Sequence, residues 1–348
     1  MTRRRHFPSI LQRMNGHQEE SWIQAISQTK RLHADAVLMP MPWSEPATMA
    51  EVFDLPVVDI SGLEKNVNKA RKQRLGVFLE IALPAATHGF HSRQLLSEFQ
   101  AKYIKPFMAL DLSGMVIRSG VDWPAEAILE LERLLRLKEG AVLFLDHGMG
   151  PDSELLDGQV DGVVDPLGVA GISRFLNGHC SGFDLGQHLS RQQDRLGINL
   201  AGRLLNPLSL LSVEEHFLAL GSGLSFTIRG YPFLPPDAVI EREYIYGPLA
   251  QLRRQRAALE WGRFVHLSLV DRPEVFAFGR ADERIEEPII VVARRSQSAA
   301  MSLPIGLGRF DTRKPFVSLL GDGKPMNVSD GWLDLEASEG PEFLVLGQ

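Results

Sequence analysis

Short, continuously apolar runs alternate with helix-like stretches between about residues 20 and 235, and this alternation restricts the possible folds more than any other feature of the sequence. The apolar runs lie at residues 36–40, 76–81, 114–117 and 141–145, with weaker ones at 160–164 and 225–228. The helix-like stretches lie at residues 22–32, 63–74 and 125–137. Continuous apolar strands are typical of a parallel sheet covered on both faces. Repeated strand–helix units of this kind predict an α/β fold, a (β/α)8 barrel of the TIM type.

The pattern changes after about residue 260. Short apolar or alternating runs follow at residues 264–269, 275–278, 288–293, 316–320, 332–335 and 343–346, separated by Gly, Pro and Asp. Such runs are typical of a β-sandwich, so we predict a C-terminal antiparallel β-sandwich after the barrel. An arginine-rich helix at residues 249–259 is expected to join the two parts. The predicted domains are therefore a barrel over residues 1–245 and the linking helix with the sandwich over 246–348.

Composition excludes several classes of function. The net charge of −6 disfavours nucleic acid as the main partner, and no run of 18 apolar residues provides a membrane span of the chain's own. The basic N-terminus leads into a mixed segment, which disfavours a signal peptide. Cys180 is the single cysteine, so neither an internal disulfide nor a cysteine-based zinc site is expected. We expect no cofactor and no metal, and Cys180 to be either a buried small side chain or an intermolecular tether.

Four segments, taken in chain order, are similar to segments of glycoside hydrolase family 13, the α-amylase superfamily. Residues 59–82 resemble the part where a helix leads into the third barrel strand, and residues 226–233 resemble the last strand. Residues 249–264 are similar to the helix that follows, and 273–280 to the first hairpin of the C-terminal sandwich. The resemblance covers nearly the whole chain and implies the same barrel and sandwich.

The catalytic motifs of that family do not match. Arg118 stands where the fourth strand carries the nucleophilic Asp, His147 at the place of the acid/base Glu, and Leu200 at the place of the third carboxylate. A guanidinium stays protonated and cannot attack a sugar carbon. Retaining hydrolysis needs two carboxyl groups about 5–5.5 Å apart, and the aligned positions do not supply them. The resemblance therefore implies a degenerate triad, with no catalytic residue expected at these positions.

The segment between the third and fourth strands is also short. Only about thirty residues separate Ile81 from Gly114, too few for the domain that active amylases insert there. This shortening and the degenerate triad resemble the heavy-chain ectodomain of heteromeric amino-acid transporters, an amylase-like protein without hydrolase activity. That resemblance implies a protein partner, such as a membrane-protein light chain, with carbohydrate as the other ligand. It also implies an extracellular location if the chain is an excised ectodomain, although the chain lacks the family's membrane helix and juxtamembrane cysteine.

The alternative is a glycoside hydrolase with relocated carboxylates. Its candidates at predicted strand ends are Asp59, Glu80, Asp122 and Asp146, with His147 as an acid/base near neutral pH. Such groups would gather at the C-terminal face of the barrel. The competing interpretation makes Asp146 the cap of a strand-end turn. In the same way, Arg118 is interpreted as a salt-bridged or capping residue at the barrel mouth.

Two weaker patterns remain. His88 and His91 form a His-x-x-His pair without a third ligand, which is more typical of exposed loop residues than of a metal site. Trp43, Trp123 and Tyr231 lie near predicted strand ends, where aromatic rings could bind carbohydrate without catalysis, although such rings more often pack in the core.

Overall fold

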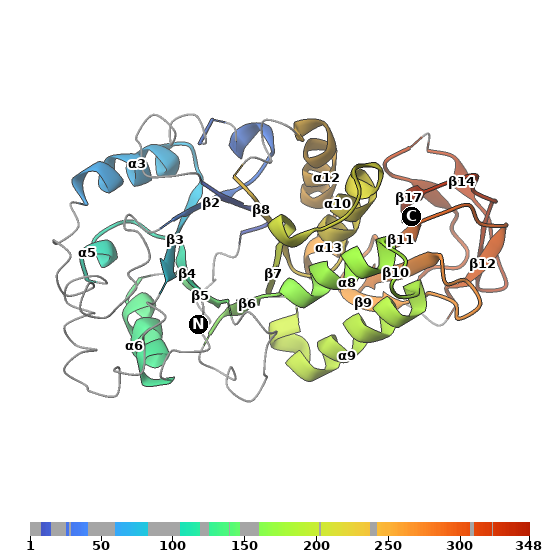
Figure 1. Ribbon diagram of the computed structural model, residues 1–348, viewed down its shortest axis with the longest axis horizontal. Coiled ribbons are helices and arrows are strands. Elements are labelled where there is room, and N and C mark those ends of the chain that lie inside the picture. Colours follow the sequence, from blue (N-terminus) through green and yellow to red (C-terminus); the bar gives the residue numbers. More distant parts are fainter. Residues whose placement is uncertain are drawn as a thin grey trace. The chain divides into compact units, whose positions relative to one another are not determined.

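The computed structural model describes residues 8–14, 26–27, 29–40, 60–82, 105–118, 125–138, 140–146, 160–201, 203–236, 242–306, 310–321 and 323–348. These residues form a closed barrel of eight strands followed by two antiparallel sheets (Figure 1). The predicted (β/α) barrel with a C-terminal β-sandwich is therefore confirmed.

The barrel strands follow one another around the ring in chain order. They are β1 (Leu11–Arg13), β2 (Ala36–Met39), β3 (Gly76–Ala82), β4 (Gly114–Arg118), β5 (Val142–Leu145), β6 (Gly162–Val164), β7 (Leu204–Pro207) and β8 (Tyr231–Leu234). Parallel pairing of Leu11 in β1 with Phe233 in β8 closes the ring. Every residue of β2, β5 and β6 is buried, which explains why these strands are continuously apolar in the sequence.

Most helices of the described chain fall between barrel strands. They are α3 (Ser61–Lys72), α5 (Lys105–Met108), α6 (Ala125–Arg136), α8 (Pro166–Leu176), α9 (Gly182–Ala201), α10 (Leu218–Thr227), α12 (Glu243–Gln255) and α13 (Ala257–Trp261), with short 3-10 turns η4 (Leu208–Leu210) and η5 (Glu215–Phe217). The helices predicted at residues 63–74 and 125–137 are confirmed by α3 and α6.

The strand predicted at residues 225–228 is wrong, because these residues lie at the end of α10. Nine of the ten residues of α10 are buried, so the helix has no polar face by which its period could be recognised. A short apolar run of this kind cannot be assigned to helix or strand by periodicity alone. The strand begins later, at Tyr231, after Gly230 turns the chain with a φ of 96°. A Cβ at Gly230 would lie 2.6 Å from the carbonyl oxygen of Leu204, so this turn requires glycine.

The C-terminal strands form a six-stranded and a three-stranded sheet. In sheet order the larger contains β14 (Pro325–Met326), β13 (Phe316–Ser318), β17 (Glu342–Gly347), β11 (Ile289–Arg294), β10 (Val275–Ala281) and β9 (Arg263–His266). The smaller contains β12 (Met301–Pro304), β16 (Trp332–Leu335) and β15 (Val328–Ser329). All pairs in both sheets are antiparallel.

The central strands of the larger sheet are buried on both faces. In β10, Val275 and Ala277 pack in one apolar cluster with Leu303 and Leu333 of the smaller sheet. The alternate residues, such as Phe276 and Phe278, pack in a second cluster with residues of α8, α9 and α10. Figure 1 shows α9 running beside β9 and β10, the strands it contacts. Because both faces are covered, β10 and β11 lack the polar alternation of a strand with one solvated face.

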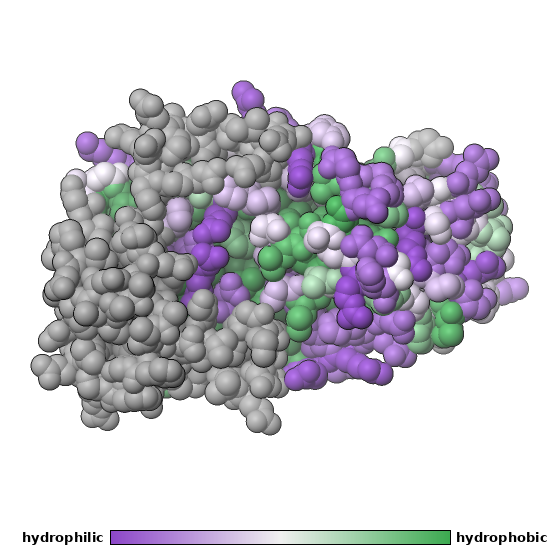
Figure 2. Space-filling view, in the orientation of Figure 1, coloured by the Kyte–Doolittle hydropathy of each residue, from purple (hydrophilic) through white to green (hydrophobic). Residues whose placement is uncertain are grey.

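The smaller sheet, by contrast, is solvated on its outer face. Along β16, Trp332 and Asp334 are exposed, whereas Leu333 and Leu335 are buried. Figure 2 shows a mainly hydrophilic surface over the C-terminal strands, interrupted by small hydrophobic patches. This alternation is the period-2 signal by which the strand was predicted.

By the density of its contacts the chain divides into two compact units. One contains Met1–Asp165 and Phe233–Glu243, and the other contains Pro166–Pro232 and Tyr244–Gln348. The boundary expected at residue 245 stays a prediction. No helix in the described ranges is both long and apolar enough to cross a membrane.

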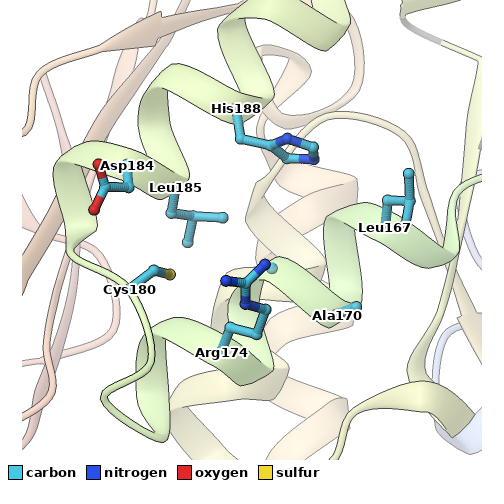
Figure 3. Close-up of a pocket in the computed structure, with 8 residues that line it drawn as sticks. Leu167, Ala170, Arg174, Cys180, Asp184, Leu185 and His188 are labelled. Atoms are coloured by element: carbon cyan, nitrogen blue, oxygen red, sulfur yellow. The ribbon is translucent and has the colours of Figure 1, made fainter.

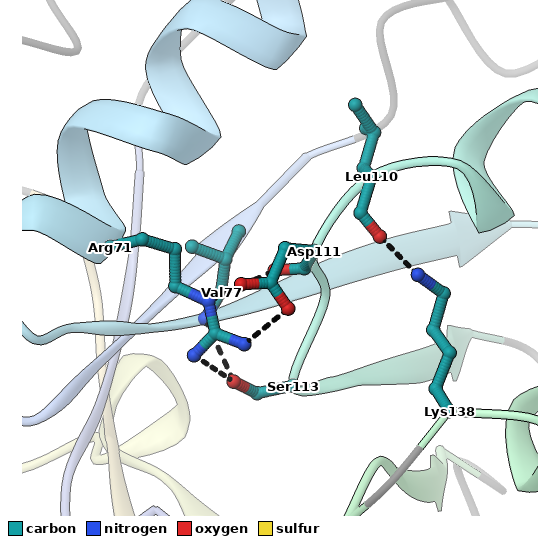
Figure 4. Close-up of polar contacts among 6 residues, drawn as sticks. All are labelled: Arg71, Val77, Leu110, Asp111, Ser113 and Lys138. Atoms are coloured by element: carbon teal, nitrogen blue, oxygen red, sulfur yellow. Dashed lines mark hydrogen bonds and ion pairs between the residues drawn. The ribbon is translucent and has the colours of Figure 1, made fainter.

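A polar network connects α3 to the start of β4 in the first unit (Figure 4). Arg71 of α3 donates to the backbone oxygen of Asp111 at 3.1 Å, to its carboxylate at 2.7 Å and to Ser113 Oγ at 3.2 Å. The same hydroxyl accepts the backbone N–H of Val77 in β3 at 3.3 Å. Lys138 donates to the carbonyl oxygen of Leu110. These bonds fix the beginnings of β3 and β4, and hence the register that positions their C-terminal ends.

Candidate functional site at the barrel strand ends

Glu80 is the centre of a charged cluster near the C-terminal ends of β1, β3 and β4. Its Oε2 lies 2.8 Å from a terminal guanidinium nitrogen of Arg13, the last residue of β1. Its Oε1 lies 3.0 Å from Nε of Arg118, the last residue of β4. The parallel register pairs Ala82 with Arg118, so Glu80 lies two residues below the level of that arginine. One carboxylate is thus held between two guanidinium groups from different strands.

The cluster is unevenly exposed. The Glu80 side chain is 6% exposed, whereas those of Arg13 and Arg118 are 32% and 38% exposed. A buried carboxylate is stable only when it is paired and hydrogen-bonded, and both oxygens of Glu80 meet that condition. With two cations and one anion, the three side chains carry a net charge of +1. Both carboxylate oxygens of Glu80 are therefore occupied by guanidinium groups.

Arg118 occupies the end of β4, where the amylase resemblance requires a nucleophile. Its guanidinium is an ion-pair partner of Glu80 rather than a side chain pointing away from the barrel. Val116 is buried two residues earlier and pairs with Glu80 across the sheet. Neither residue supplies a carboxylate, so the position can contribute charge and hydrogen-bond donors but not covalent catalysis.

Two further carboxylates follow adjacent strands. Asp146 comes directly after β5 and is half-buried, and its backbone N–H donates to the carbonyl oxygen of Ile117 at 2.7 Å. Asp165 comes directly after β6 and is 1% exposed. Since Leu145 pairs with Val163, both carboxylates lie at the same end of neighbouring strands. They are the strand-end acids of the described barrel besides Glu80.

Several predicted site residues lie outside the described residues. These are Asp59, Asp122 and His147 among the alternative catalytic candidates, His88 and His91 of the His-x-x-His pair, and the aromatic residues Trp43 and Trp123. Of the other candidates, the structure brings Glu80 and Arg118 into direct contact and places Asp146 after the neighbouring strand. Within the described ranges, no group of three or more His, Cys, Asp or Glu side chains could hold a metal ion.

The resemblance assigns the position of the third carboxylate to Leu200. Leu200 lies in the last turn of α9 and not at a strand end, because α9 continues to Ala201 and β7 starts at Leu204. The polar residue of β7 is Asn206, which is fully buried and donates to the carbonyl oxygen of Arg229 at 2.9 Å. Pro207 and Leu208 follow it, so the end of β7 also lacks a carboxylate.

Tyr231 is not an exposed aromatic platform. It is 1% exposed, and the guanidinium of Arg253 lies 5.8 Å from its ring centroid. Arg253 donates to the carbonyl oxygen of Phe226 at 2.8 Å and also to that of Gly230. A second buried arginine, Arg280, donates to the carbonyl oxygen of Thr227 at 3.3 Å. These cations satisfy carbonyl groups at the C-terminus of α10, where positive charge is favourable.

Sequence reasoning missed Arg13 and Asp165. Arg13 lies in a three-residue strand too short to show periodicity, so nothing in the sequence marks it as part of the site. Asp165 could have been found, because it follows the run Val163-Val164 as Asp146 follows β5.

Comparisons with known proteins add to this geometry. No family model matches the chain, and no curated protein does. Solved structures do: an α-amylase from Geobacillus thermoleovorans complexed with acarbose has a TM-score of 0.73 at 12% identity, covering 97% of this chain and 98% of its own. A maltogenic α-amylase from Thermotoga neapolitana has a TM-score of 0.79 at 11% identity, with coverage of 97% and 98%.

The chain has the α-amylase fold. A debranching enzyme from Nostoc punctiforme is also similar, with a TM-score of 0.75 at 9% identity over the full length of both chains. At such low sequence identities the similarity shows a shared backbone fold and nothing more. It does not transfer an activity, because one fold hosts many functions.

Proposed function

We propose that this chain is a non-hydrolytic protein on the α-amylase fold, with a degenerate catalytic triad, that acts by binding. The observation that carries the proposal is the ion pair between Arg118, at the end of β4, and Glu80 of β3. A hydrolase of the retaining type needs one carboxylate as nucleophile and one carboxylic acid as proton donor. In this chain the nucleophile position holds the cation Arg118, and the carboxylate that contacts it, Glu80, forms ion pairs with two arginines.

The ligand in this proposal is a protein partner, in an ancillary role like that of the transporter heavy chains, or a carbohydrate. The resemblance to the heavy-chain ectodomain supports the first, since that branch also combines an amylase-like barrel with a lost triad. The names of the structural neighbours support the second, because two are amylases and one is a debranching enzyme. Either ligand would use a rigid barrel and sandwich as a binding surface.

Hydrolysis assays test the first half of the proposal. Purified protein should release no reducing sugar from starch or maltooligosaccharides above the blank. Arg118→Asp should not restore turnover, because the other two members of the triad would still be missing and such residues act as a unit. Arg133→Asp, in an exposed position of α6, is a matched control for charge reversal. Turnover by the unmodified protein would overturn the proposal.

Binding assays test the second half. Pull-down from a membrane extract and a glycan array, done with the same protein, distinguish the two ligands. Repeating the pull-down with Cys180→Ser and with reductant shows whether a disulfide tether takes part. The structure bears on this last point, because partial burial raises the pKa of the Cys180 thiol, which disfavours the reactive thiolate. We therefore expect an unchanged set of captured proteins.

A glycoside hydrolase with relocated carboxylates is the second candidate. The observation that favours it is the pair Asp146 and Asp165 at the ends of the adjacent strands β5 and β6. Under this alternative Asp146→Asn and Asp165→Asn would each abolish a measurable hydrolysis of α-glucosides, whereas Asp194→Asn, in an exposed position of α9, would not. If the unmodified protein shows no turnover on these substrates, this alternative is excluded for them.

A further inference from the structure

A surface crevice of about 210 Å³ lies between α8 and α9 in the second unit. Figure 3 shows side chains from both helices and from the turn between them pointing into it. Leu185, which is buried, and Ala170, which is exposed, contribute apolar surface. Arg174 and His188 stand at the rim, and the Cys180 sulfur points into the space between them (Figure 3). The crevice is smaller than the pockets of about 300–1,000 Å³ that hold drug-sized ligands.

The acidic residue of the crevice is already engaged. The Asp184 carboxylate accepts the Ser181 hydroxyl at 2.7 Å and the Ser181 backbone N–H at 3.2 Å. In return the Ser181 hydroxyl accepts the backbone N–H of Asp184 at 3.0 Å. This is a capping arrangement at the start of α9, and its hydrogen bonds lower the pKa of Asp184. These bonds hold the carboxylate at the start of α9, and within the described residues it forms no ion pair with Arg174 or His188.

The basic side chains of the crevice are those of Arg174 and His188. In the part of the chain that the structure describes, the side chains of Arg174 and His188 have no hydrogen-bond or ion-pair partner. They project from facing helices toward the same space (Figure 3). An arginine is always protonated and presents donors that match a carboxylate, and a histidine can add one further donor. The rim thus offers converging donors to an anion, above an apolar floor.

We propose that this crevice binds a small organic acid, with its carboxylate between Arg174 and His188 and its short apolar chain over Leu185. The volume suits a chain of about six carbons better than a sugar ring with its hydration shell. Gly171 of α8 contributes to the space, since a Cβ there would lie 2.9 Å from a methyl group of Leu185. The site is independent of the barrel cluster around Glu80 and of the function proposed for it.

The single cysteine makes the crevice directly measurable. Because Cys180 is the only thiol of the chain, its alkylation by iodoacetamide can be followed by mass spectrometry of the intact protein. Hexanoate should slow this alkylation in a saturable manner. Hexanamide, which has the same shape but no charge, should need about tenfold or higher concentration for the same protection, because a hydrogen bond to a charged group is the stronger one.

Variants identify the residues that hold the acid. Arg174→Gln should weaken hexanoate protection about tenfold or more, and His188→Gln should weaken it to a smaller extent, each compared with its own rate without ligand. Arg191→Gln is the matched control, since Arg191 is exposed on α9, contacts Gln187 and lies outside the crevice. Ala170→Phe should fill the space and make Cys180 alkylation insensitive to hexanoate. The proposal is overturned if hexanoate gives no protection, if hexanamide protects equally, or if Arg174→Gln leaves protection unchanged.

Discussion

Arg253 offers the most direct test of how the end of the barrel is held. Its side chain is 2% exposed and lies in α12, yet it reaches the carbonyl oxygens of Phe226 and Gly230 on either side of the turn into β8. Replacing it with methionine keeps the aliphatic stem but removes every donor. Two carbonyl groups that were paired would then lose the arginine donors, in a region from which water is largely excluded.

The expected decrease in the free energy of unfolding follows from these contacts. A hydrogen bond to a charged group contributes about 1.5–3 kcal/mol, and a cation over an aromatic ring contributes about 0.5–2 kcal/mol. An opposing effect comes from Arg280, whose pKa is lowered by burial and by the nearby charge of Arg253, so removing Arg253 relieves repulsion. We expect Arg253→Met to lower the free energy of unfolding by about 3–5 kcal/mol, a large share of the total of about 5–15 kcal/mol for a typical protein.

The free energy of unfolding is measured by urea denaturation, with circular dichroism and tryptophan fluorescence as the two probes of unfolding. Arg254→Met is the matched control, because Arg254 is the next residue of the same helix and is exposed. It should change the stability by less than about 0.5 kcal/mol. If Arg253→Met lowers the free energy of unfolding by no more than Arg254→Met does, Arg253 does not stabilise the end of α10 and the reasoning is refuted.

Two further predictions concern α9 and the strands it packs against. Gly182→Ala should destabilise the protein by about 2–4 kcal/mol in urea denaturation, because the new Cβ would lie 1.9 Å from the backbone oxygen of Val275. Gly62→Ala, with nothing within 4 Å, should instead stabilise it by about 0.5–1 kcal/mol, and equal effects would contradict the packing. Burial lowers the pKa of His266, so the folded state binds its proton less readily than the unfolded chain. Stability should therefore fall as the pH drops below about 6.5, and His266→Gln should show a smaller fall between pH 7.5 and 5.5.

The hydropathy pattern of the chain was enough to predict both the barrel and the sandwich. Continuous apolar runs such as residues 141–145 indicated strands buried on both faces, and β5 is buried at every position. The short run at residues 332–335 indicated a strand of the sandwich, and β16 lies there with alternating exposed and buried residues. These predictions are confirmed because buried positions of a strand carry apolar side chains and solvated positions carry polar ones, so the hydropathy pattern follows the burial pattern. The absence of a carboxylate at residue 118 could likewise be read directly.

Which side chains contact one another depends on how the strands and helices pack. Arg13 and Arg118 reach Glu80 from strands distant in the sequence, and a local pattern contains no information about such partners. The helical state of residues 225–227 depends on α10 being covered almost all round, which a short apolar run does not reveal. Cys180 and Arg174 share one crevice because α8 and α9 pack side by side. The physical reason is the same in each case: a pattern of hydropathy specifies how deeply a residue is buried, whereas contact, charge pairing and cavity shape arise only when separate elements pack together.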